Sequence, residues 1–418
     1  MPARAALQRR TLIVLSCAQI LGGLGVGANV AAGGLIAADV SGSDAVAGIA
    51  STTAVLGAAA AAIPLASLTS ARGRRYGLAL GMLVGALGAA LVVAGAATGW
   101  LPAVLAGTLA TGAATASGLQ ARYAATDLAL PARAAGALSL VVWATTIGAV
   151  LGPNLADPGA RIGQALGILD LAGVYVISGA AFLLACCVVW VALRPDPLLE
   201  ARRADPASAP TDIGAPLREK VRLAWAVVRP RPDAVLGLAA VALGHTAMVA
   251  VMVMTPVHMA GADVTVTVIG VVISVHILGM YAWSPVVGWA SDRYGRRPIL
   301  VVGACLLLSA SAVAGLAHAD SAVAMGAGLL LLGLGWSCTL VAGSTLLSES
   351  VPATSRQDVQ GLSDLAMNTC AAVGGALAGG VVAWASYGWL ALLAGAIVLP
   401  LAVAALRRGA PARAAAGR

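Results

Sequence analysis

The chain has 418 residues, of which 60% are hydrophobic and only 10% are charged, and its formal net charge is +8 at pH 7. A soluble domain has about 45–50% apolar and about 25% charged residues, so this composition excludes a fold with most of its surface in water. The positive charge does not indicate nucleic-acid binding, because the basic residues lie between apolar runs rather than on one face of a soluble domain.

Twelve apolar runs follow one another along the chain, each close to the length of about 20 residues that crosses a bilayer as a helix. We predict spans at 11–33, 45–69, 76–97, 99–122, 135–156, 171–193, 234–259, 264–290, 298–317, 321–346, 359–384 and 386–406. The expected fold class is therefore an all-α membrane protein with twelve transmembrane helices in two pseudo-symmetric six-helix bundles.

One long polar stretch separates the sixth span from the seventh and divides the chain. We expect an N-terminal bundle over 1–193, a cytoplasmic linker over 194–233 with a short helix near Leu217–Val228, a C-terminal bundle over 234–406, and a basic cytoplasmic tail over 407–418. If the N-terminus is cytoplasmic, every one of the 25 Lys and Arg residues except Arg161 lies on the cytoplasmic side. This asymmetry predicts cytoplasmic termini in a multi-pass protein of the cytoplasmic (inner) membrane.

The loops after the second and eighth spans carry similar basic motifs, which suggests an internal repeat. Together they form what we call the gate motif: Gly73, Arg74 and Arg75 in the first loop, and Gly288, Asp292, Arg293, Gly295, Arg296 and Arg297 at the second. The second copy resembles the GxxxDRxGRR signature of the major facilitator superfamily. The first copy departs from the pattern, with Ala66 and Ser70 where Gly and Asp are expected.

The resemblance to this superfamily implies a secondary transporter whose two halves enclose a solute site. A glycine turn would place the Arg side chains against helix C-termini, and Asp292 against a neighbouring Arg or a helix N-terminus. Such a cytoplasmic contact would hold one gate state and break in the other. Gly148, Gly152 and Pro153 in the fifth span are similar to the GxxxGP element of proton antiporters, and they predict close helix packing and a kink.

Methionine and histidine are concentrated in the seventh and eighth spans. His245, Met248 and Met252 are spaced three and four residues apart and so share one helix face, and His276 and Met280 share a face of the next helix. The two helices are consecutive and antiparallel, so these faces can meet near the middle of the bilayer, where an ionisable group usually has a function. Thioether and imidazole ligands together select a soft cation, above all Cu(I).

The same Met and His residues also carry a resemblance to one branch of the superfamily. The MxxxM of Met248 and Met252, followed by the HxxxM of His276 and Met280, resembles the CcoA-like copper importers, the CalT family. His245 is not part of that pattern. The resemblance implies copper ion as the transported substrate, imported by alternating access, with no permanently bound cofactor.

Two other transport functions remain open. One is transport of an organic solute such as a riboflavin-like metabolite, and the other is drug/proton antiport, although the deep acidic residue usual in the N-terminal half of such antiporters is missing. We find no Ser-His-Asp arrangement, phosphate-binding GxxxxGK[ST] loop or phosphorylatable Asp in a DKTG context, so we expect neither an enzyme nor ATP-driven transport. We expect a monomer whose partners are the lipid bilayer and a small-molecule or metal-ion substrate.

Overall fold

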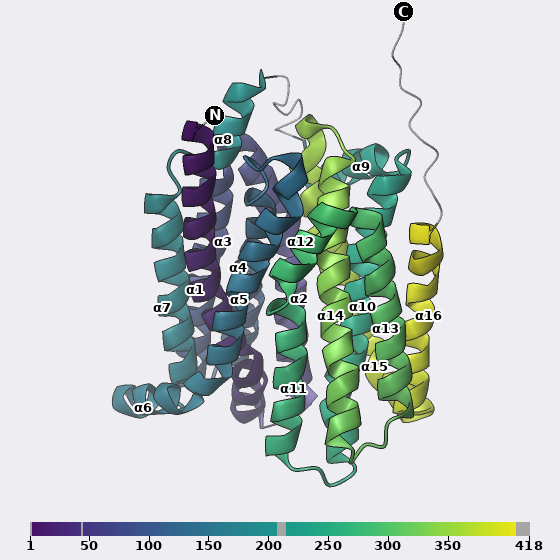
Figure 1. Cartoon of the computed structure of the whole chain (residues 1–418). Helices are drawn as coiled ribbons and strands as arrows, with labels where there is room; N and C mark the ends of the chain where they lie inside the picture. The colour runs from purple at the N-terminus through teal and green to yellow at the C-terminus, as the bar shows by residue number, and fades with distance from the viewer. Residues whose placement is uncertain (1, 43–44, 207–214, 407–418) are drawn as a thin grey trace, which may run out of the picture.

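The computed structural model describes residues 2–42, 45–206 and 215–406, and this part of the chain is helical with no β-strand. The predicted basic tail over 407–418 lies outside the described residues. The helices of the N-terminal half are α1 (Pro2–Ser41), α2 (Ala45–Arg72), α3 (Arg74–Thr98), α4 (Leu101–Ala124), α5 (Ala134–Leu151), α6 (Ala156–Leu166) and α7 (Ala172–Ala192). Figure 1 shows long, roughly parallel helices, with the short α6 lying across one end of the bundle.

The fifth span ends earlier than predicted, in a way that the GxxxGP element explains. Helix α5 ends at Leu151, and residues Gly152–Leu155 form a 3₁₀ turn before α6, so the element ends the helix instead of only bending it. Close packing occurs as expected. A Cβ atom on Gly148 would lie 2.3 Å from the backbone nitrogen of Leu24 in α1, a separation that only glycine permits.

Helices α10 (Pro232–Ala260) to α16 make up the C-terminal half. They include α11 (Val266–Tyr281), α12 (Ser284–Tyr294), α13 (Arg296–Leu316), α14 (Ala322–Glu349), α15 (Arg356–Trp384) and α16 (Tyr387–Leu406). The predicted eighth span is thus two helices, broken at Ala282 and Trp283. Pro285 lies in the first turn of α12, and because proline lacks an N–H and disfavours helical backbone before it, it accounts for the break.

Eleven helices in the described part of the chain are long and apolar enough to cross a membrane. The predicted fourth span forms α4, but α4 does not belong to this set because threonine, serine and glycine lower its hydropathy. It packs closely against α2 and α3 and buries Thr108, Ser117 and Gln120. Twelve membrane-crossing helices therefore remain a prediction.

The linker contains two helices, α8 (Pro197–Ala204) and α9 (Leu217–Val228), and the predicted helix near Leu217–Val228 is confirmed. Figure 1 shows the start of α1, both linker helices and the end of α16 at the same end of the molecule, which we call the linker end; α6 lies at the opposite, far end. Ala224 and Val228 of α9 join an apolar cluster with Ile63 of α2 and Leu362 of α15. The linker thus packs on both halves of the protein.

Candidate functional site

Two fully buried charged side chains meet between the N-terminal and C-terminal helix bundles. Nη2 of Arg122, near the end of α4, donates a hydrogen bond of 2.6 Å to Oδ1 of Asp364 in α15, and the two side chains are 2% and 0% exposed. The neighbouring Tyr123 hydroxyl lies 3.3 Å from Ser363 Oγ. Asp364 is eight residues into α15, about 12 Å along the helix axis from its linker end.

Several hydrogen-bonding atoms of the Arg122–Asp364 pair are not used by the described residues. Nη2 of Arg122 also contacts the Tyr123 hydroxyl at 3.2 Å, but Nε and Nη1 of Arg122 and Oδ2 of Asp364 have no hydrogen-bond partner among the described residues. Buried donors and acceptors are usually satisfied, since an unsatisfied one costs about 1–3 kcal/mol. The pair therefore joins the bundles and retains unused hydrogen-bonding capacity.

The second copy of the gate motif contacts the opposite bundle through Asp292. Its two carboxylate oxygens accept hydrogen bonds from the backbone N–H groups of Ala135 (3.1 Å) and Gly136 (2.7 Å), at the start of α5. Nη1 of Arg296 donates to Asp292 Oδ1 at 2.7 Å, and Nη2 of Arg296 donates to Glu349 Oε1 at 2.9 Å. A carboxylate at a helix N-terminus is favourable because the unpaired N–H groups carry partial positive charge. Asp292 therefore contacts both partners that the motif predicts, a neighbouring Arg and a helix N-terminus.

Glycine allows this part of the motif to approach the other bundle. A Cβ atom on Gly288 would lie 2.0 Å from Ser139 Oγ and 2.7 Å from the backbone oxygen of Ala135, so α12 and α5 could not pack as they do with any other residue at position 288. Gly295 has φ +95°, a conformation that residues with a side chain rarely adopt. Arg297 binds Asp233 at 2.6 Å within the C-terminal bundle, whereas Arg293 is exposed.

The first copy of the gate motif uses different partners. Arg74 donates to both carboxylate oxygens of Asp127, at 2.8 and 3.0 Å, and to Gln360 of the other bundle at 2.9 Å. Where the superfamily pattern has an aspartate, this chain has Ser70, and a carboxylate from the linker lies nearby instead: Asp196 Oδ2 accepts from the backbone N–H of Arg75 at 2.8 Å. The linker therefore supplies a carboxylate that the motif lacks.

His276 and Met280, two of the predicted metal ligands, are buried on α11. The Nδ1 atom of His276 lies 2.8 Å from the carbonyl oxygen of Leu329 in α14, so Nδ1 carries the proton. Its Nε2 atom is buried and has no partner among the described residues. This nitrogen keeps a lone pair that could bind a metal, and the Nδ1 hydrogen bond is of the kind that orients a ligating histidine.

The remaining predicted ligands lie on α10. Met248 is buried and Met252 partly buried in the apolar core of the C-terminal bundle. Nδ1 of His245 accepts a hydrogen bond of 2.8 Å from the indole Nε1–H of Trp336. Helix α11 packs mainly along α14, and α10 mainly along α14 and α15, so convergence of the two Met/His faces on one pocket remains a prediction. The described residues contain no cluster of three or more His, Cys, Asp or Glu that could hold a metal ion.

The family model described as Major Facilitator Superfamily matches residues 15–265 and 245–417. The chain belongs to the major facilitator superfamily. It is 38% identical to the "Uncharacterized MFS-type transporter YddS" of Bacillus subtilis (strain 168) over 384 residues, which cover 91% of this chain and 86% of the relative. It is 29% identical to the "Riboflavin transporter RfnT" of Brucella anthropi over 415 residues, 98% of this chain and 99% of the relative.

Among solved structures, the human organic anion transporter MFSD10 has a TM-score of 0.73 at 17% identity and covers 95% of this chain and 99% of its own, a likeness of fold alone. The chain is thus a multi-pass membrane transporter of a small solute and not an enzyme. These relatives do not support the resemblance to the CcoA-like copper importers.

Sequence reasoning missed the pairing of Arg122 with Asp364. In this superfamily member both residues lie inside long helices but near the predicted ends of their spans, where a charged residue normally reaches water. A signal was available, because a charged residue that faces the interior of a membrane protein is expected to have a partner of opposite charge.

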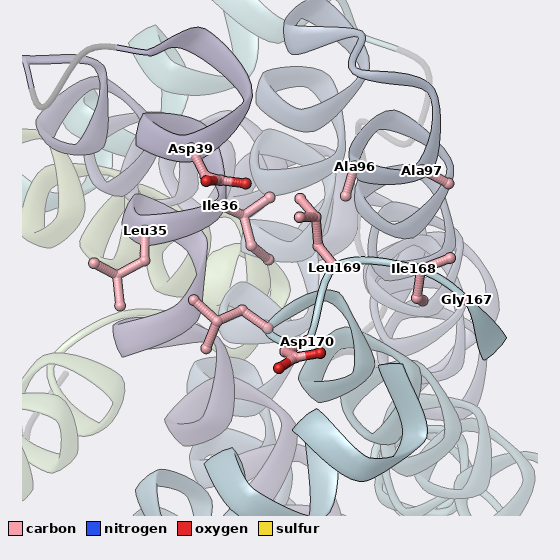
Figure 2. Close-up of a pocket in the computed structure, with 10 residues that line it drawn as sticks. Leu35, Ile36, Asp39, Ala96, Ala97, Gly167, Ile168, Leu169 and Asp170 are labelled. Atoms are coloured by element: carbon pink, nitrogen blue, oxygen red, sulfur yellow. The ribbon is translucent and has the colours of Figure 1, made fainter. Parts of the chain in front are cut away.

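A cavity of about 800 Å³ lies at the far end of the transporter, but it belongs to one bundle. Figure 2 shows its lining by the ends of α1 and α3 and by the segment between α6 and α7, with Asp39 and Asp170 among the labelled residues. A motion of one bundle against the other would not expose this cavity to alternate sides of the membrane. The interface between the bundles is therefore the better candidate for the transport site.

Proposed function

We propose that this protein carries a small organic solute by alternating access, driven by a gradient, and that the structure corresponds to the state closed at the linker end. The observation that carries this proposal is the set of polar contacts between the bundles in that half of the molecule, where Asp292 binds the start of α5 and Arg122 binds Asp364. The positive-inside asymmetry of the sequence supports the assignment of the linker end to the cytoplasm of an inner-membrane protein. In the alternate state these contacts would break.

An uncharged, planar solute fits the residues between the bundles best. The charges of Arg122 and Asp364 offset each other, so a neutral solute leaves no uncompensated charge in the interior. Aromatic side chains are close by: the rings of Tyr281 and Trp336 pack edge to face with centroids 5.4 Å apart. The similarity to RfnT along nearly the whole chain supports riboflavin as the first solute to test.

Uptake by the purified protein in proteoliposomes tests this function. We expect saturable riboflavin uptake that depends on an imposed proton or sodium gradient, and no uptake with empty liposomes. A drug/proton antiporter would instead move a cationic dye such as ethidium against a proton gradient. Absence of riboflavin uptake under every imposed gradient would contradict the riboflavin proposal.

Copper import is a second candidate, favoured by the buried Nε2 atom of His276, which has no hydrogen-bond partner in the part of the chain that the structure describes. In that case His276, Met280, Met248 and Met252 would bind the transported ion, and radiocopper uptake by cells is the assay. Changing His276 or Met248 to Ala should abolish uptake at unchanged amounts of protein in the membrane, while His318→Ala, between α13 and α14, should not. Equal uptake by all variants would exclude copper import through these residues.

A further inference from the structure

We propose that His245 contacts the transported solute and donates a hydrogen bond from Nε2–H to one of its carbonyl oxygens, with Trp336 as the positioning residue. This inference rests on the proposed transport of an organic solute and specifies its chemistry: a planar molecule with a carbonyl group. Three observations carry it, namely the position of His245, the hydrogen bond that fixes its tautomer, and the aromatic residues beside it.

His245 lies deep in the protein yet remains partly accessible. It is 13 residues into α10, about 20 Å from the linker end of that helix, and it is partly exposed although Gly244 and Thr246 on either side are buried. The side chain is directed toward the interior and not toward lipid, because it binds the buried Trp336. In the proposed site, the accessible part of His245 faces the space between the bundles.

The hydrogen bond with Trp336 determines which ring nitrogen of His245 carries the proton. An indole N–H can only donate, so Nδ1 of His245, 2.8 Å from Nε1 of Trp336, must be the unprotonated acceptor. The imidazole is then neutral, with its single proton on Nε2. The nitrogen that Trp336 does not occupy is thus a hydrogen-bond donor, and it matches a carbonyl oxygen on a solute.

The same geometry disfavours two other ligands at His245. A metal ion needs a lone pair on Nε2, and while Trp336 donates to Nδ1 such a lone pair requires the imidazole to lose its last proton. A cationic group is disfavoured because an ammonium or guanidinium has no acceptor for the N–H that the ring presents. A neutral hydrogen-bond acceptor, such as a carbonyl oxygen, can bind the Nε2–H without loss of a proton from the ring.

Aromatic side chains extend this site in a way that suits a planar ring system. Trp336 packs edge to face against Tyr281 with an interplanar angle of 80°, and its ring centroid lies 6.0 Å from that of His245. Tyr281, at the end of α11, is also partly exposed. Aromatic walls with a few fixed polar groups are typical of sites for flat heterocycles.

Riboflavin uptake by the full-length protein in proteoliposomes tests the proposal. Replacing His245 by Leu should raise KM about five- to tenfold, the value of one hydrogen bond, with little change in kcat. His245→Gln, whose amide places an N–H donor near the position of Nε2, should restore most of the affinity. For the wild type, an analogue of riboflavin with a thiocarbonyl in place of one ring carbonyl should have a higher KM than riboflavin. For His245→Leu, the KM values of the analogue and of riboflavin should be nearly equal. His318→Leu is the matched control.

A second readout reports on Trp336 independently of transport. The chain has four histidines, so ¹⁵N-histidine labelling gives few signals, and the His245 signal is assigned by its loss in His245→Gln. We expect the Nε2–H tautomer in the wild type, a mixture of tautomers in Trp336→Phe, and a shift of the Nε2 signal on addition of riboflavin. A positioning role for Trp336 is overturned if Trp336→Phe leaves the tautomer unchanged.

The outcomes separate this inference from the proposed function. Riboflavin uptake with equal KM for the wild type and His245→Leu overturns the role of His245 and leaves riboflavin transport intact. Absence of riboflavin uptake by the wild type overturns both.

Discussion

Replacing Asp364 by Asn should shift the protein strongly toward the state that is open at the linker end. The change leaves Arg122 buried without its counter-charge, and removing one member of a buried ion pair costs about 3–5 kcal/mol. The two side chains are 2% and 0% exposed and belong to different bundles, so the penalty applies to the closed state and is relieved when the bundles separate and water reaches Arg122. Even the lower value shifts the equilibrium by more than about 100-fold.

Distances between spin labels at the linker end measure this shift. Ala71 at the end of α2 and Tyr294 at the end of α12 are exposed and lie on opposite bundles, so labels there should report a longer distance in Asp364→Asn than in the wild type. The control is the double variant Arg122→Leu, Asp364→Leu, which removes both charges and should return to the short distance because an apolar pair can replace a buried ion pair. A wild-type distance in Asp364→Asn, or a long distance in the double variant, would refute the reasoning.

Two further substitutions probe the same closed end through backbone contacts. Asp292→Asn should favour the open state by about 1–3 kcal/mol, because an amide has a single acceptor oxygen and its NH2 group cannot accept, so one of the two bonds from Ala135 N–H and Gly136 N–H is lost. The same label distances check this, and an unchanged distribution would restrict Asp292 to folding. Gly288→Ala should prevent α12 from closing against α5 and lower the uptake rate about tenfold, as an overpacking penalty of about 1–3 kcal/mol in the closed state implies. Gly379→Ala, whose added methyl has no described atom within 4 Å, should transport normally. Equal uptake rates in these two glycine variants would show that the close approach at position 288 has no part in transport.

The helical architecture was largely predictable because membrane spans depend on local composition. Residues Leu217–Val228 form the expected linker helix, and the Asp292 contact with the start of α5 was predictable because a motif encodes both the turn and the charge. The break at Ala282 and Trp283 was missed, although Pro285 marks it, because the surrounding apolar residues continue without interruption.

The sequence signals that a buried Arg122 needs a partner of opposite charge, but it does not say that the partner is Asp364. The two residues are 242 positions apart, and their contact depends on which helices of the two bundles adjoin and at what depth. The tautomer of His245 likewise depends on Trp336, which is 91 positions away in another helix. Periodicity predicts which residues share a helix face, but it does not say which neighbouring helix that face meets.

The position of α9 has a consequence for how transport rates can change. Ala224 and Val228 fill an apolar cluster with residues of α2 and α15, so separating the bundles at this end must also strip α9 from at least one of them and hydrate that apolar surface. The linker that connects the two halves therefore also stabilises the closed end through apolar contacts of α9. A substitution, modification or bound lipid that loosens α9 would make opening faster without altering a single group that touches the solute, so turnover and selectivity can vary independently in this protein.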